Sequence, residues 1–448
     1  MFCYMEIIYL IVAVLFIVVL TTKLKVHPFL ALLIISIAYG IFAGMPLQDI
    51  TTAINDGFGG TLGKIGLIIV LGVIIGAFLE HTGGAQTIAK SVLKLIGKKR
   101  IPLAMGLIGY IVSIPVFADS GFMLLHPLSK GLSRKAGLSL AGAAIALGLG
   151  LMASHTMVPP TPGPIAAAGI LGANLGLVIA IGIPVSLITL GAAVVFATKF
   201  AAKTYIDPDK GDETAVELVP EPTEEPGIVR SSIPIVIPIV LIVLKSVFIK
   251  GGAAELGPLQ SLIAFLGDPV IALLIGVFLC LLLPKRLHLE MLSSSGWVGK
   301  AIKDAASILM ITGAGGIFGT VLQMSGIAEV LGNSLKDLNI GIFLPFLLAA
   351  ALKTAQGSST VALVTTASIL APMMTSLGYE SEIQKALVVV SIGAGSAMIS
   401  HANDSFFWVV TQMSGMNVKT GYKLFGLGTV VLGTTAAIAV FIASLLWA

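Results

Sequence analysis

Charged residues are scarce in this sequence. Asp, Glu, Lys and Arg make up 11% of its 448 residues, whereas a soluble globular chain has about 25%. A chain with so little charge could not cover its surface in water. Hydrophobic residues make up 56% of the sequence, and the mean hydropathy is +1.04. This composition is typical of a membrane protein.

Cysteines and catalytic motifs are equally scarce. The two cysteines, Cys3 and Cys280, lie in or beside apolar runs, which excludes a disulfide framework and a cysteine-based metal site. No G-x-x-x-x-G-K-[ST] loop is present, so the sequence contains no sign of a nucleotide-hydrolysing enzyme. The net charge of +4 is scattered over loops and indicates no nucleic-acid partner. We expect no enzymatic activity, no cofactor and no metal.

Long apolar runs fill much of the chain. A helix that crosses ~30 Å of hydrocarbon needs about 20 residues, and the runs near this length are 7–20, 28–45, 65–79, 176–198, 233–244, 270–283 and 424–446. They are continuous, which excludes the alternating strands of a β-barrel. The N-terminal run lacks a basic start and a cleavage site, so we interpret it as a retained span. The sequence predicts an all-α polytopic membrane protein.

A polar segment divides the chain. Residues 203–230 are acidic and contain proline, which predicts a cytoplasmic linker between residues 1–202 and 231–448. The two halves resemble each other, because MASH at 152–155 matches MISH at 398–401, 246 residues later. A second match joins GAFLEHTGG at 76–84 to GTVLQMSGI at 319–327, 243 residues later. We interpret these matches as an internal repeat.

Basic residues orient the spans, because Lys and Arg are enriched in cytoplasmic loops. The basic loops lie at 23–25, 94–100, 199–203 and 285–286, whereas 44–63 and 251–258 are poor in basic residues. Placing the basic loops inside puts the N-terminus outside, and it makes the second half start on the opposite side from the first. The sequence therefore predicts an inverted repeat, as in secondary transporters that hold substrate at broken helices.

Four segments interrupt the apolar pattern: 114–123 (IPVFADSGFM), 154–164 (SHTMVPPTPGP), 353–361 (KTAQGSSTV) and 400–408 (SHANDSFFW). Within a membrane, backbone leaves the helix only where it is buried in protein or lines a wet cavity. Helix N-termini carry a fractional positive charge and can hold a carboxylate. The four segments therefore predict broken helices around a site for an organic acid.

Titratable residues in these segments suggest a coupling site. Inserting an Asp at the centre of a membrane helix costs roughly 2.5–3.5 kcal/mol of free energy. Asp119 is therefore expected to bind substrate or carry a proton. The alternative role is to cap a helix that begins at Gly121. His401 and Asp404 would share one helix face; because His titrates near physiological pH, they form a proton-coupling pair or simply brace the break. His155 is a hydrogen-bond donor to substrate or a structural residue.

Neutral side chains in the third segment suit a polyhydroxylated ligand, or they bond their own helix backbone; they are Gln356, Ser358, Ser359 and Thr360. Lys353 could meet a substrate carboxylate, but we favour an extended conformation that reaches the membrane interface. Asp56 and Lys64 are interpreted as interfacial residues at a span end.

The sequence resembles the gluconate permease family of proton symporters, within the wider ion-transporter superfamily. The matching stretches span essentially the whole chain: HPFLALL (27–33), GGTLG (59–63), GGAQTIA (83–89), VPPTPGP (158–164), FLGDPV (265–270), GAGGIF (313–318), GSSTVA (357–362) and SHANDSFFW (400–408). The resemblance implies import of a sugar acid such as gluconate with protons across a bacterial inner membrane. It also implies a homodimer in which a transport domain with two re-entrant hairpins and two broken helices slides in an elevator motion.

Two positions depart from the family pattern. Asp119 stands where the gluconate permeases carry Glu. Near the position of Gln356, those permeases carry an apolar residue. Gluconate, glycerate and other aldonates therefore all remain open as substrates.

The sequence thus predicts a secondary active transporter that imports a hydroxylated organic acid by proton symport. A membrane sugar-acid sensor and a sodium-coupled carboxylate transporter remain as alternatives. The predicted substrate-binding residues are Asp119, Ser120, Ser154, His155, Thr161, Gln356, Gly357, Ser358, Ser359, Thr360 and Asn403, and the predicted proton-coupling residues are Asp119, His401 and Asp404.

Overall fold

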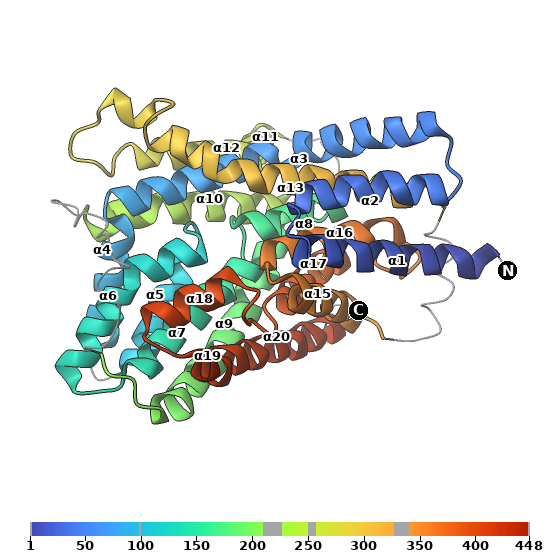
Figure 1. The fold of residues 1–448 in the computed structure, drawn as a ribbon. Helices are drawn as coiled ribbons and strands as arrows, with labels where there is room; N and C mark the ends of the chain where they lie inside the picture. Colours follow the sequence, from blue (N-terminus) through green and yellow to red (C-terminus); the bar gives the residue numbers. More distant parts are fainter. Residues whose placement is uncertain (1, 98–99, 209–225, 250–256, 327–339, 447–448) are drawn as a thin grey trace.

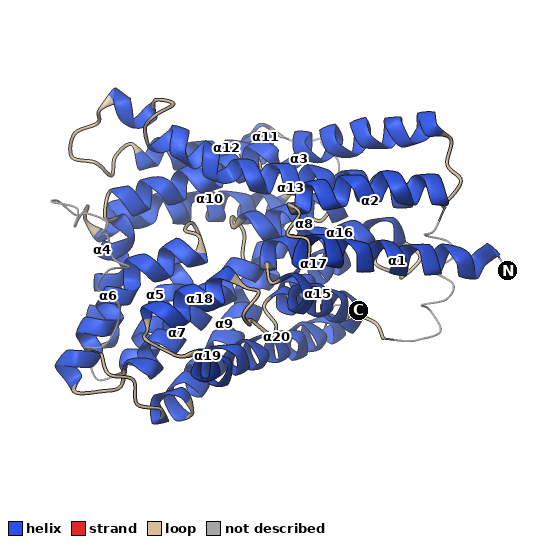
Figure 2. Cartoon of the chain, in the orientation of Figure 1, coloured by secondary structure: helices blue, strands red, loops and turns tan. Residues whose placement is uncertain are grey.

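The structure is a computed structural model that describes residues 2–97, 100–208, 226–249, 257–326 and 340–446 (Figure 1). The described residues form helices, turns and loops, without a strand (Figure 2). The predicted all-α class is therefore confirmed for this part of the chain.

The helices of the first half are α1 (Phe2–Thr22), α2 (Pro28–Phe42), α3 (Leu47–His81), α4 (Gly84–Ile96), α5 (Ile101–Val112), α6 (Ala118–Ala136), α7 (Leu140–Met157), α8 (Pro162–Leu171) and α9 (Leu175–Lys199), followed by the short η1 (Ala201–Lys203). The helices of the second half are α10 (Ile228–Phe248), α11 (Pro258–Leu266), α12 (Pro269–Cys280), η4 (Leu289–Leu292), α13 (Trp297–Met324), α15 (Phe343–Gln356), α16 (Ser359–Leu370), η5 (Ala371–Met373), α17 (Glu382–Ser396), α18 (Ser405–Met413), α19 (Val418–Gly421), η6 (Tyr422–Gly426) and α20 (Leu427–Leu446). Residues 209–225 of the predicted linker and residue 327 of the predicted repeat lie outside the described residues.

Six helical stretches in the described chain are long and apolar enough to cross a membrane. They are Leu47–His81, Leu140–Leu171, Leu175–Lys203, Ile228–Phe248, Leu289–Met324 and Val418–Leu446, and the bent pair of α11 and α12 would make a seventh. This confirms a multi-pass membrane protein.

Helices α3 and α13 lie side by side along much of their length, at the upper edge of the view in Figure 1. Their backbones touch where two glycines meet: a Cβ on Gly57 would lie 2.7 Å from the carbonyl oxygen of Gly316. Helix α2 packs on α13, and α12 packs on α3. Small residues at helix crossings allow such close packing in membranes. We call this group of helices the α3/α13 layer.

All four predicted segments overlap a break between helices. The breaks separate α5 from α6, α7 from α8, α15 from α16 and α17 from α18. Two of them contain proline, which lacks the N–H that a helix needs: Pro115 in the first break, and Pro159 and Pro160 in the second. The third turns at Gly357, whose φ of +84° is favourable only for glycine. Three of the four breaks are therefore encoded locally.

The long helices and the broken helices come in the same order in the two halves, although among the described residues α4 intervenes only in the first half and α19 and η6 only in the second. A long helix (α3 or α13) is followed by two helix–break–helix units, α5–α6 and α7–α8 or α15–α16 and α17–α18, and then by a long last helix, α9 or α20. Helix α7 packs on α5, α6 and α9, and α17 packs on α15, α16 and α20. Pro159, Pro160 and Gly357 in these breaks are buried, whereas Ala402 and Asn403 in the fourth break are exposed.

Candidate functional site

The first turns of α8 and α16 face each other. A Cβ on Gly163 would lie 3.8 Å from the Cα of Thr360. The hydroxyl of Ser359 also lies 3.8 Å from the sulfur of Met152 on α7. The break before α16 is thus next to the break between α7 and α8.

The start of α6 packs against α7 and α18. The ring centroid of Phe117, just before α6, lies 6.3 Å from that of His155 on α7. The rings of Phe122 on α6 and Phe406 on α18 meet edge to face with centroids 6.1 Å apart. The first turn of α6 therefore lies between the other breaks.

Lys353 and Asp404 join the third break to the fourth. Lys353 Nζ lies 2.7 Å from Asp404 Oδ2, and the two side chains are 1% and 5% exposed. Lys353 also donates to the carbonyl of Gly357, and Asp404 accepts from the Ser400 hydroxyl and from the backbone N–H of Phe406. Two buried charges compensate each other only when they are paired and well bonded. The prediction that Lys353 extends to the interface is wrong, because its partner lies inside the protein.

His401 and Asn403 bond the end of α15. The last carbonyls of a helix have no partner within it. His401 Nε2 lies 2.7 Å from the carbonyl oxygen of Thr354, and Asn403 Nδ2 donates to the carbonyls of Thr354 and Ala355 at 2.9 and 3.0 Å. Both residues precede α18, so the expectation that His401 and Asp404 share a helix face is wrong. The contacts described for His401 brace the break.

Four side chains at the breaks contain buried polar atoms without a hydrogen-bond partner among the described residues. These atoms are Oδ1 of Asp119, Oγ of Ser154, Nδ1 of His155 and both amide atoms of Gln356. A buried polar group left unbonded costs about 1–3 kcal/mol. The charges of Lys353 and Asp404 act on both Asp119 and His155, so these groups share one electrostatic environment. A carboxyl, an imidazole, an amide and a hydroxyl that lack partners at one place indicate a site for a polar ligand.

The structure contradicts the interpretation that Asp119 caps a helix. Helix α6 begins at Ala118, with Phe117 at the N-cap, and not at Gly121. Asp119 therefore lies within the first turn and does not cap the helix. The partial positive charge of a helix N-terminus favours a carboxylate there.

Two predicted hydroxyls bond the backbone. Ser358 is the N-cap of α16 and accepts from a backbone N–H at 3.3 Å, and the Thr161 hydroxyl donates to a backbone carbonyl at 2.6 Å. Ser120 and Thr360 lie in the first turns of α6 and α16. All four residues lie at the N-terminal ends of helices that begin at the breaks.

Sequence reasoning missed the support for the fourth break. Ile399 has a φ of +43°, a costly conformation for a β-branched residue. The backbone N–H of Ser400 donates to the hydroxyl of Thr429 at 3.0 Å, and the π-helical turn η6 lies directly before α20. Single π-helical turns are frequent at functional sites. No local pattern signals this contact, because Thr429 is distant in the sequence. The Lys353–Asp404 pair did have a signal: opposite charges in two segments that both interrupt the apolar pattern.

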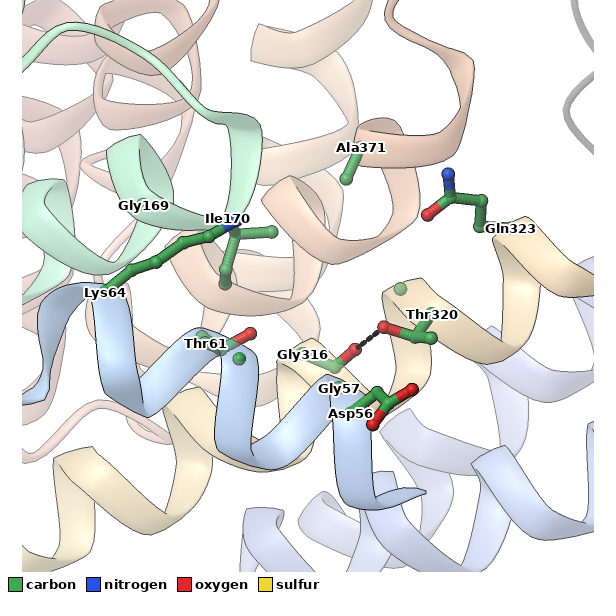
Figure 3. Close-up of a pocket in the computed structure, with 12 residues that line it drawn as sticks. Asp56, Gly57, Thr61, Lys64, Gly169, Ile170, Gly316, Thr320, Gln323 and Ala371 are labelled. Atoms are coloured by element: carbon green, nitrogen blue, oxygen red, sulfur yellow. Dashed lines mark hydrogen bonds between the residues drawn. The ribbon is translucent and has the colours of Figure 1, made fainter. Parts of the chain in front are cut away.

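A second feature is a cavity of about 220 Å³ between the α3/α13 layer and the C-terminal ends of α8 and α16. Figure 3 shows Lys64 extending from α3 toward Ile170 near the end of α8, with Thr61 on the same helix and Thr320 and Gln323 on α13. None of the predicted site residues lines this cavity. Helix α8 is 10 residues long, so Gly163 in its first turn at the breaks and Ile170 in its last turn at the cavity are about 10 Å apart along the helix axis.

A multi-pass helical protein whose broken helices surround unpaired polar groups has the architecture of a secondary transporter. The model of the family described as GntP family permease matches residues 5–446, and the chain belongs to this family. The predicted family is thereby confirmed. Because the family consists of permeases, the expectation that this chain is not an enzyme is confirmed as well.

Curated relatives cover nearly the whole chain. An inner membrane permease of Escherichia coli is 35% identical, with 94% of each chain covered. A gluconate permease of Pseudomonas aeruginosa is 33% identical over 97% of this chain and 96% of its own. A D-serine transporter of E. coli is 33% identical over 97% of each chain. The relatives and the apolar helices indicate a multi-pass inner-membrane protein.

One solved structure has a similar fold. The YdaH transporter of Alcanivorax borkumensis aligns with a TM-score of 0.60 and 14% identity, over 90% of this chain and 89% of the other. At this identity the likeness concerns the fold alone.

Proposed function

We propose that this permease imports a small polar carboxylate that carries a hydrogen-bonding group on the neighbouring carbon. The observation that supports this substrate class is the set of unpaired groups on Asp119, Ser154, His155 and Gln356. The relatives named for gluconate and D-serine transport act on compounds that share this chemistry. A carboxylate next to a hydroxyl or amino group needs both acceptors and donors, and the site contains both.

The starts of three helices supply much of the recognition. Helices α6, α8 and α16 begin at the breaks, and their N-termini attract a carboxylate without an additional cation. Ser120, Thr161 and Thr360 lie in these turns or at their caps. The amide of Gln356 and the imidazole of His155 would bond the substrate's hydroxyl groups. Gluconate, glycerate and other aldonates are the candidates that we propose.

Proton symport is our proposal for the energy source. The unpaired carboxyl of Asp119 supports it. Asp404 and His401 were predicted as coupling residues as well, but their bonds to Lys353 and to the end of α15 favour a structural role. A sodium-coupled cycle is the competing outcome of the test below.

We further propose an elevator motion between inverted halves, residues 1–202 and 231–448, joined by the linker at 203–230. The shared order of elements supports the repeat. The cavity leaves part of the boundary between the α3/α13 layer and the ends of α8 and α16 unfilled, which supports relative movement. In this scheme the N-terminus is outside, α5–α6 and α15–α16 act as re-entrant hairpins, and the family resemblance suggests a homodimer.

The function is tested with purified protein in proteoliposomes. Thermal shifts with gluconate, glycerate, D-serine and glucuronate would identify a ligand, and counterflow of that ligand would demonstrate transport. Accumulation driven by a pH gradient supports proton symport, whereas accumulation driven only by a sodium gradient contradicts it. Binding without counterflow would identify a sensor.

The motion and the orientation are tested by cysteine labelling. Thr61→Cys in a chain with Cys3→Ser and Cys280→Ser places one thiol beside the cavity. We expect a membrane-impermeant maleimide to label it from outside, at a rate that substrate changes. Ala53→Cys on the same helix is buried and serves as the unlabelled control. Labelling from inside alone would contradict the orientation.

A further inference from the structure

The two buried carboxyls of the site have different partners. Both oxygens of Asp404 are bonded, Oδ1 by the N–H of Phe406 and Oδ2 by Lys353 and Ser400. Oδ1 of Asp119 is buried without a partner among the described residues. The positive charge of Lys353 is therefore already compensated by Asp404. A negative charge on Asp119 has no such compensation among the described residues.

A carboxylate ligand would add a second negative charge beside Asp119. Two carboxylates that share a buried site hold a proton between them, because like charges at short range repel strongly in a medium of low dielectric constant. Loading the site with an organic acid therefore requires one proton.

Asp119 is the group that can accept this proton. The charged and titratable groups that act on it, or share its surroundings, come from three elements: Lys353 on α15, Asp404 before α18 and His155 on α7. A proton on Asp404 would remove the compensation of Lys353. A proton on His155 would place a second positive charge near Lys353, whereas a proton on Asp119 removes a negative charge close to Asp404.

We propose that Asp119 binds one proton for each substrate carboxylate, so that the empty and the loaded site carry the same net charge. The proton binds a carboxylate oxygen when substrate enters and leaves when substrate leaves. One anion and one proton then cross per cycle, and transport of a monocarboxylate is electroneutral. This inference rests on the proposed function, because it assumes that the site transports a carboxylate.

The test compares the wild type with Asp119→Asn, Asp119→Glu and the partly exposed control Asp49→Asn in proteoliposomes. The probe is gluconate or glycerate, whichever gives the faster wild-type counterflow. A pH gradient of one unit, acidic outside, should drive about tenfold accumulation by the wild type, by Asp119→Glu and by the control. Asp119→Asn should not accumulate the probe, and any counterflow that it shows should not respond to the pH gradient. A potassium diffusion potential should leave accumulation unchanged.

A second measurement does not depend on the Asn variant. Binding of the probe to detergent-purified wild type in weakly buffered solution should take up one proton per ligand. Accumulation by Asp119→Asn at the wild-type level, accumulation that follows the membrane potential, or binding without proton uptake would each overturn the proposal. Wild-type protein that shows no counterflow with either probe would instead refute the proposed function, and the inference would fall with it.

Discussion

Lys353 Nζ and Asp404 Oδ2 are 2.7 Å apart in the interior of the protein, although 51 residues separate them in the chain. This ion pair connects the C-terminal end of α15 to the N-cap of α18. Because the pair is buried, it ties the geometry of the α15–α16 break to that of the α17–α18 break. Removing either charge leaves the other without compensation.

A double-mutant cycle measures this coupling. Asp404→Asn keeps an oxygen that can cap α18 but leaves Lys353 uncompensated, so we expect a loss of about 3–5 kcal/mol in stability. Lys353→Met should cost a similar amount, and the double variant should be more stable than either single variant. Thermal unfolding in detergent provides the measurement. Additive losses would show that the two residues do not interact.

Replacing Gly357 should disrupt the third break. Its φ is +84°, and a Cβ there would lie 2.2 Å from the carbonyl oxygen of Asn403. Gly357→Ala should therefore displace Asn403 and abolish substrate binding. Gly378 has a φ of +79° with open space around a Cβ, so Gly378→Ala introduces the same backbone cost without the clash. Equal thermal shifts with ligand in the two variants would contradict this explanation.

The crossing of α3 and α13 should tolerate no side chain at Gly57. A Cβ there would lie 2.7 Å from Ile317 Cα and from the Gly316 carbonyl oxygen. Gly57→Ala should lower the melting temperature, even though alanine favours helix by up to about 1 kcal/mol. Gly60 lies one turn away, and a Cβ on it meets nothing within 4 Å. Gly60→Ala should raise the melting temperature or leave it unchanged; a drop equal to that of Gly57→Ala would refute the packing argument.

Gln356 should determine which acids the site accepts. Both of its amide atoms are buried without a partner among the described residues. Gln356→Leu should stabilise the empty protein, because it removes unbonded polar atoms. The same change should weaken binding of hydroxylated acids by about tenfold or more, since a site that bonds a hydroxyl loses specificity when that bond is removed. Binding titrations with gluconate and with a deoxy analogue provide the comparison, and Gln48→Leu on the exposed side of α3 is the control. Equal loss for both ligands would argue against a hydroxyl contact.

Local signals in the sequence were sufficient for the helical architecture. Apolar runs near the length of a membrane span predicted the polytopic class. Proline and glycine marked three of the four breaks, because Pro115, Pro159, Pro160 and Gly357 act on the backbone at their own positions. The family followed from motifs spread along the whole chain and is confirmed.

Partners across the fold were decided by the tertiary structure alone. Asp119, His155 and Gln356 were predicted as site residues from residue type and position, but which of them lack partners depends on neighbours from other helices. The prediction for Lys353 was wrong because a lysine near a helix end can either reach the membrane interface or form an internal ion pair. The sequence does not show that Asp404 lies close enough to form that pair. The sequence by itself therefore determined the multi-pass helical class and the bends that contain proline or glycine, but the apolar runs did not predict the spans Leu140–Leu171 and Leu289–Met324. Only the packing of the bent segments decided which buried charges are paired and which carboxyl oxygen has no partner among the described residues, because electrostatic compensation depends on distance in space and not on separation along the chain.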